Sequence, residues 1–133
     1  MKHPKLEDVM TPMPFVVRPE DTIALAQRIM NLRRIRHLPV VRDDELVGLL
    51  SQRNVQLHGN QARVADAMVT HPYAVDVATP LDDVVTTMAA RKLGSAVVTH
   101  QGRVVGVFTT VDALRMLAGL LTCEDQAGIS QRK

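Results

Sequence analysis

Apolar residues follow two different periods along this chain, and the same succession of periods occurs twice. Residues 23–30 and 81–88 place apolar side chains at spacings of three and four, which is typical of a helix that buries one face. Two β-rich runs follow each segment, with two polar or glycine residues between them: 37–41 and 45–50, then 95–99 and 103–108. We therefore predict a helix followed by a β-hairpin in each copy.

Shorter elements flank each helix and hairpin. Apolar runs at 14–17 and 72–75 predict a first strand in each copy. A closing helix is expected from Gln52 to about His58 in the first copy and from Thr110 to Leu121 in the second. Each copy then has the order β-α-β-β-α, and the predicted fold class is mixed α/β, of the α+β type.

The starts of the two long helices carry residues that commonly cap helices. Thr79 is expected to accept a hydrogen bond from a free N–H group, with Pro80 at the first helical position, where its missing N–H costs nothing. Asp21 occupies the corresponding cap position of the first copy. These residues predict helices that begin at 22 and 80.

The two copies align without a gap when the chain is shifted by 58 residues. Identical pairs include Asp8 and Asp66, Met10 and Met68, Pro14 and Pro72, Met30 and Met88, Val40 and Val98, and Gly48 and Gly106. An internal duplication explains this alignment most simply. We predict a first repeat at 5–58, a linker at 59–63, a second repeat at 64–121 and a polar tail at 122–133.

Composition limits the class of protein. Units of about 60 residues bury little surface alone, so the two copies are expected to share one core. Apolar residues make up 46% and charged residues 23% of the 133 positions, and no apolar run is long enough to cross a membrane. Without an export signal in residues 1–10, and with Cys123 as the single cysteine, a cytoplasmic protein is expected.

Each copy contains one heptad with candidate chemistry, at Gly48–Asn54 and at Gly106–Asp112, in which Ser or Thr precedes Asn or Asp by three positions. One interpretation is a helix start, because a Ser/Thr cap with a polar acceptor three residues later resembles a capping box. The other is a ligand site, where Asp112 accepts hydrogen bonds from a ribose diol and helix N–H groups attract phosphate. Asn54 is the weaker acceptor, because an amide carries no charge.

Three motifs together resemble a known family. They are Met10-Thr11-Pro12, the segment Arg36 to Val41, and the heptad that occurs twice in register. The chain resembles the pair of cystathionine-β-synthase-type (CBS) domains, or Bateman module, from about Lys5 to Leu121. The resemblance implies pseudo-two-fold symmetry and regulatory binding of an adenosyl ligand (AMP, ADP, ATP, NAD or S-adenosylmethionine) between the repeats. It also implies a flat, disc-shaped homodimer that signals to an effector protein by a change of conformation.

The resemblance also implies which residues bind the nucleotide. Around Asp112 they are Thr109, Met10, Pro14, Phe15 and Ile35. Around Asn54 they are Ser51, Arg53, Met68, Pro72 and Tyr73, with Leu93 nearby. For the apolar members the alternative is ordinary core packing.

Arg36 and His37 match positions that contact phosphate in the family, whereas the second copy has Gly94 and Ser95 there. The alternative for Arg36 is the solvated end of an arginine-rich helix. The ribose carboxylate thus belongs to the second copy and the cations to the first. Either phosphates reach across the pseudo-two-fold axis, or the ligand is less anionic, as S-adenosylmethionine is.

The sequence bears on three other classes of function. No nucleophile with its base, carboxylate pair or metal-ligand spacing is recognisable, so neither an enzyme nor a required cofactor is expected. Net charge is only +2, and the chain has two Phe, one Tyr and no Trp, so nucleic-acid binding is not expected despite Arg33, Arg34 and Arg36. A ligand-free dimerisation or protein-interaction module is the remaining alternative.

Overall fold

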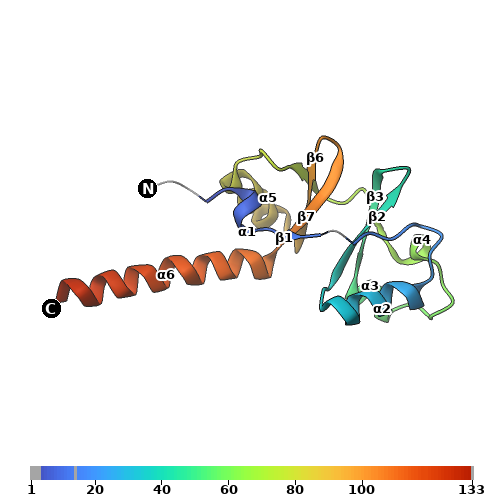
Figure 1. The fold of residues 1–133 in the computed structure, drawn as a ribbon, viewed down its shortest axis with the longest axis horizontal. Helices are drawn as coiled ribbons and strands as arrows, with labels where there is room; N and C mark the ends of the chain where they lie inside the picture. Colours follow the sequence, from blue (N-terminus) through green and yellow to red (C-terminus); the bar gives the residue numbers. More distant parts are fainter. Residues whose placement is uncertain (1–3, 14, 133) are drawn as a thin grey trace.

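The computed structural model describes residues 4–13 and 15–132 and has the alternating helices and hairpins that the sequence predicts (Figure 1). Its elements are α1 (Leu6–Val9), β1 (Thr11–Pro12), α2 (Ile23–Arg33), β2 (His37–Arg42), β3 (Glu45–Ser51), α3 (Gln52–Gln56), α4 (Val64–Ala67), β4 (Val69–Thr70), β5 (Ala74–Asp76), α5 (Leu81–Arg91), β6 (Ser95–His100), β7 (Arg103–Thr109) and α6 (Thr110–Arg132). The mixed α/β class and both helix–hairpin units are confirmed.

The strands form two sheets that mirror the duplication. One sheet has the order β1-β7-β6-β5, and the other has the order β2-β3-β4. Each is built on an antiparallel hairpin, β6–β7 or β2–β3. In the first sheet β5 runs parallel to β6, and in the second Val17 forms a single parallel bridge with Val40.

Of the strand predicted at 14–17, the structure therefore shows only the bridge at Val17. The strand predicted at 72–75 is observed as β5, which begins and ends later in the chain. Pro39 explains the difference between the copies. In the second copy Val97 N donates to Tyr73 O at 2.9 Å and extends the pairing. The equivalent donor in the first copy would be the nitrogen of Pro39, which has no N–H.

Each sheet contains one short strand that comes from the other repeat. Strand β1 pairs with β7 of the second repeat, and β4 pairs with β3 of the first. Leu6 of α1 is 1% exposed and belongs to the apolar cluster of the second repeat. Val64 of α4 is fully buried in the cluster of the first. The two cores therefore exchange their leading segments.

Both predicted helix caps are wrong by one residue. Thr22 caps α2, where its Oγ1 accepts from Leu25 N at 3.2 Å, while Asp21 accepts from Arg18 N in the preceding turn. Pro80 has ψ of 135°, so α5 begins only at Leu81 and has no side-chain cap. Acidic residues in its first turn, Asp82 and Asp83, favour the positive end of the helix instead.

The last helix is longer than its apolar pattern predicts. The sequence predicted Thr110 to Leu121, but α6 continues to Arg132 and projects beyond the rest of the fold (Figure 1). In the first repeat, α3 ends at Gln56, two residues before the expected end. None of the helices in the described part of the chain combines the length and apolar character needed to span a membrane.

Candidate functional site

Asp112 is the only buried polar or charged residue among those described, with 5% of its surface exposed. Its Oδ2 accepts from Thr109 N at 2.9 Å and Thr109 Oγ1 at 3.1 Å, and Thr109 Oγ1 accepts from Asp112 N at 3.2 Å. This is a capping box at the start of α6. The helix-start interpretation is thus correct, but it accounts for only one carboxylate oxygen.

The other oxygen of Asp112 faces the exchanged segment. Thr11 of β1 donates its hydroxyl to Asp112 Oδ1 at 2.9 Å, across 101 positions of sequence. The guanidinium of Arg115, one turn later on α6, lies 4.0 Å from the same oxygen and is largely exposed. Asp112 is therefore held at a junction of α6, β7 and the leading segment of the other repeat.

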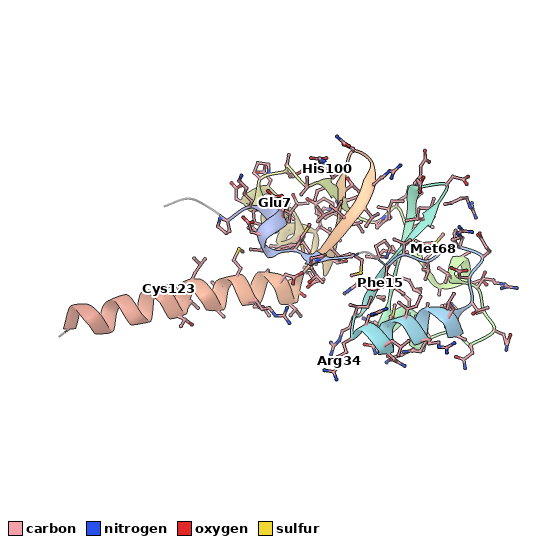
Figure 2. The ribbon with its side chains drawn as sticks, viewed as in Figure 1. Glu7, Phe15, Arg34, Met68, His100 and Cys123 are labelled. Carbon is pink, nitrogen blue, oxygen red and sulfur yellow. The ribbon has the colours of Figure 1, made fainter. Side chains whose placement is uncertain are left out.

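A cleft of about 470 Å³ opens at this junction. Its lining includes Arg34, Arg36 and His37 from the first repeat and Asp112 and Arg115 from the second. Arg34 ends α2 in the left-handed conformation, with φ of 55°, and turns the chain into β2. Figure 2 shows Arg34 at the end of α2 nearer to α6. The cations of one repeat and the carboxylate of the other therefore share one cleft.

The surroundings of His37 in the cleft change its pKa. Burial lowers its pKa below the ordinary value of 6.5, and the neighbouring Arg36 guanidinium lowers it further. The carboxylate of Asp112 opposes this and raises the pKa of His37. His37 therefore favours the neutral form, although it faces the carboxylate across the cleft.

The model of the CBS domain family matches residues 6–57 and 64–119. The chain belongs to the CBS domain family. A curated relative is the uncharacterized 33.4 kDa protein in the ribosomal RNA operon of Thermofilum pendens, 30% identical over 132 residues. That match covers 86% of this chain and 44% of the relative, so the chain spans less than half of its length.

Solved CBS structures share the fold. The AcuB protein of Vibrio cholerae has a TM-score of 0.79 at 25% identity, with 94% of this chain and 98% of that chain covered. The cytosolic domain of the Mg²⁺ channel MgtE, solved in complex with ATP, has a TM-score of 0.75 at 26% identity. That comparison covers 86% of this chain and 49% of the MgtE chain. A pair of CBS repeats is therefore confirmed as the fold.

Five of the residues predicted around Asp112 line its cleft, and two described ones do not. Those in the cleft are Ile35, Arg36, His37, Thr109 and Asp112. Met10 packs against Gly106, where an added Cβ would lie 2.6 Å from Met10 Sδ. Gly106 thus makes room for a side chain of the protein. Phe15 packs on the first core under the Arg33 guanidinium, 4.5 Å from its ring centre (Figure 2). Pro14 lies outside the described residues.

The sequence missed the other seven residues of this cleft: Thr11, Met13, Arg34, Val107, Thr110, Val111 and Arg115. Two of them carried a signal. Thr11 stands in the Met-Thr-Pro motif, and Arg115 follows Asp112 by three positions, which puts both on one face of a helix. Arg34 and Met13 reach the cleft only through the tertiary fold.

The residues predicted around Asn54 are not brought together in the same way. Asn54 Oδ1 accepts from Ser51 N at 3.2 Å and from Ser51 Oγ at 2.6 Å, in a second capping box. Met68 packs against Gly48, and Tyr73 packs on the second core beside Arg91. A second cleft of about 450 Å³ lies between α5 and α6 and includes Leu93. Neither cleft is lined by the other predicted members: Ser51, Arg53, Asn54, Met68, Pro72 and Tyr73.

Proposed function

We propose that this CBS pair is a regulatory module that binds an adenosyl ligand in the Asp112 cleft. The observation that carries the proposal is the meeting of a buried carboxylate with four cationic or titratable basic side chains in one cleft: Arg34, Arg36, His37 and Arg115. Perturbed ionisable groups gathered in a concave site are a common mark of function.

The chemistry of the cleft matches the parts of a nucleotide. Asp112 offers a carboxylate to the ribose hydroxyls, since its present partners Thr11 and Thr109 are hydroxyl groups that a ribose diol can replace. Ile35, with Met13 and Val107, supplies an apolar wall for a base. The MgtE domain, which has this fold, was solved with ATP, and this supports the same ligand class here.

Charge favours a phosphate over a sulfonium. Three guanidinium groups face a single carboxylate in the cleft, so its field attracts anions. S-adenosylmethionine carries a positive sulfonium, which this field would repel. The carboxylate and the cations belong to different repeats but line one cleft, which supports a phosphate that reaches across the pseudo-two-fold axis.

Signalling requires that the ligand prefer one arrangement of the two repeats over another. The Asp112 cleft draws its residues from both repeats, so a bound ligand would stabilise one relative orientation. We propose that a homodimer transmits this change to an effector protein in the cytoplasm. The exposed leucines of α6 supply an apolar surface for such contacts, among them Leu114, Leu117 and Leu121.

The second candidate function is a ligand-free interaction module. The same exposed face of α6 favours it, because Leu114 is 63% exposed and Leu121 is 51% exposed. This module would dimerise or bind a partner protein with the cleft empty.

Thermal unfolding with AMP, ADP, ATP, NAD or S-adenosylmethionine separates the two functions. A ligand at about 100 times its dissociation constant adds about 2.7 kcal/mol of stability. We expect ADP to raise the Tm, Arg36→Gln to reduce that shift, and Arg28→Gln, exposed on α2 outside the cleft, to preserve it. No shift with any compound, in folded protein, would reject the ligand-binding function in favour of the interaction module.

A further inference from the structure

The two repeats provide an internal comparison of the ligand position. A shift of 58 residues converts each group at the Asp112 cleft into its counterpart at Asn54. In that shift Thr11 corresponds to Val69, Arg36 to Gly94, His37 to Ser95, Asp112 to Asn54 and Arg115 to Leu57. We infer that the two positions have diverged in function, so that each chain binds one phosphate-bearing adenosyl ligand, at Asp112, and none at Asn54. This inference rests on the proposed function.

The ribose acceptor is the first group that differs. A carboxylate has two acceptor oxygens, and Asp112 uses Oδ2 for the capping box and Oδ1 for Thr11. Asn54 has one acceptor oxygen, which already accepts from the backbone and hydroxyl of Ser51. The other group of its side chain is an NH₂ donor. Two ribose hydroxyls would therefore have only one acceptor oxygen at Asn54, and this oxygen already accepts two hydrogen bonds.

The phosphate cations are the second difference. Arg36 and His37 have Gly94 and Ser95 as counterparts, which carry no charge. Arg115, beside the carboxylate, is matched by Leu57, which is 72% exposed. Lys92 keeps a charge at the position of Arg34, but it lines the groove between α5 and α6. Arg53 is exposed on α3, outside both clefts. The Asn54 position therefore lacks the clustered guanidinium groups that a phosphate needs.

The exchanged segments provide the third difference. Thr11 of β1 donates a hydrogen bond to Asp112 at 2.9 Å and ties the carboxylate to the other repeat. Its counterpart in β4 is Val69, which has no side-chain donor and is 53% exposed. A hydrogen bond from the exchanged segment to the proposed ribose acceptor is thus present at Asp112 and has no side-chain donor at the Asn54 position.

Helix capping does not explain this divergence. Both heptads form the box: Asn54 N donates to Ser51 Oγ at 3.1 Å, as Asp112 N does to Thr109 Oγ1 at 3.2 Å. The residues that differ most, Thr11, Arg36 and His37, take no part in either box. They share only their place in the cleft. Ligand binding at that cleft, and not helix formation, is the property that separates the copies.

Isothermal titration of the full chain with ADP tests the stoichiometry. We expect about one ADP per chain in the unmodified protein. Asp112→Asn should weaken binding at least about tenfold, because it removes a charge-assisted acceptor. Asn54→Asp is the mirror-image control and should leave both stoichiometry and affinity unchanged. Arg36→Gln, a change of an exposed side chain, should also weaken binding and covers the case in which Asp112→Asn does not fold.

Two results would overturn the inference and leave the proposed function standing. One is two ADP molecules per chain. The other is a single ADP whose affinity changes in Asn54→Asp but not in Asp112→Asn or Arg36→Gln. A folded protein that binds no ADP and none of the other adenosyl compounds would instead overturn both proposals.

Discussion

His37 lines the Asp112 cleft and is influenced by charges of both signs. Arg36 precedes it in sequence, and the buried Asp112 faces it from α6. Desolvation is the largest influence on its pKa, and it disfavours the imidazolium form. A phosphate bound beside His37 would add a negative charge and favour the protonated form, so the residue is placed to respond to an anionic ligand.

The lowered pKa of His37 predicts how stability depends on pH. In the unfolded chain the imidazole takes up a proton near its ordinary pKa of 6.5, whereas the folded chain resists protonation to a lower pH. The contribution of His37 to the free energy of unfolding is therefore fully present above pH 6.5. It is lost as the pH falls from there through the lowered pKa of the folded state.

Urea unfolding between pH 7.5 and 5 checks this prediction. We expect His37→Gln to reduce the decline in the free energy of unfolding below pH 6.5. His100→Gln, at the end of β6 and exposed, is the matched control and should leave the decline unchanged. An equal decline of the free energy of unfolding in the His37 variant and the unmodified protein would contradict the role of His37 in this pH dependence.

At this scale the sequence predicted contacts between residues close in the chain more reliably than contacts between distant ones. Thr109 and Asp112 stand three positions apart, so their contact is local and follows from the start of a helix. Met10 and Phe15 are expected from the sequence to bind the nucleotide. In the structure both pack against the protein instead, because apolar side chains near a site can also be buried in a core. Whether such a side chain faces ligand or core depends on distant packing, which no local pattern records.

The exchange of leading segments is the main feature at the level of secondary-structure elements. Helix α1 and strand β1 complete the second repeat, while α4 and β4 complete the first (Figure 1). A two-residue strand is too short to persist alone, so β1 depends on its pairing with β7. Since Thr11 lies in β1, the exchange also brings a hydroxyl to Asp112.

Leu6 tests how much stability the exchange contributes. It is 1% exposed in the core of the second repeat, so Leu6→Ala should lower the free energy of unfolding by about 2–5 kcal/mol. Leu32→Ala, 72% exposed on α2, should change it by less than about 0.5 kcal/mol. Urea unfolding measures both values, and hydrogen exchange should show the loss of protection in β6 and β7. Similar effects of the two substitutions would contradict the exchanged core.

At the scale of the whole molecule, α6 carries a series of exposed apolar side chains. Val111, Leu114, Leu117, Leu120 and Leu121 are between 43% and 63% exposed. The same helix contributes Thr110 and Ala113 to the groove between α5 and α6. A homodimer formed through helix faces would bury this surface, because an isologous contact pairs the same face of both copies.

Leu117→Glu tests that dimer. A charge at the centre of the apolar face should shift the protein from dimer to monomer at micromolar concentration, since burying an unpaired carboxylate is costly. Val16→Glu, at a comparably exposed valine outside the helices and strands, is the control and should leave the mass unchanged. Light scattering after size-exclusion chromatography measures the mass. A monomeric unmodified protein, or a Leu117 variant that stays dimeric, would contradict the proposed interface.

The sequence was sufficient for the duplication, the two helix–hairpin units and the acceptor at Asp112. The helices, the hairpins and the capping box depend on periods or spacings within about 15 residues, where the backbone restricts which side chains can meet. The duplication is visible as a direct match of residues 58 positions apart. The tertiary structure alone decided that Arg34, Arg36 and His37 of one repeat lie in the cleft of Asp112 in the other. It also decided that β1 and β4 cross between repeats. These contacts join segments such as Thr11 and Asp112, 101 positions apart, whose meeting depends on the packing of two cores and leaves no periodic trace in the chain.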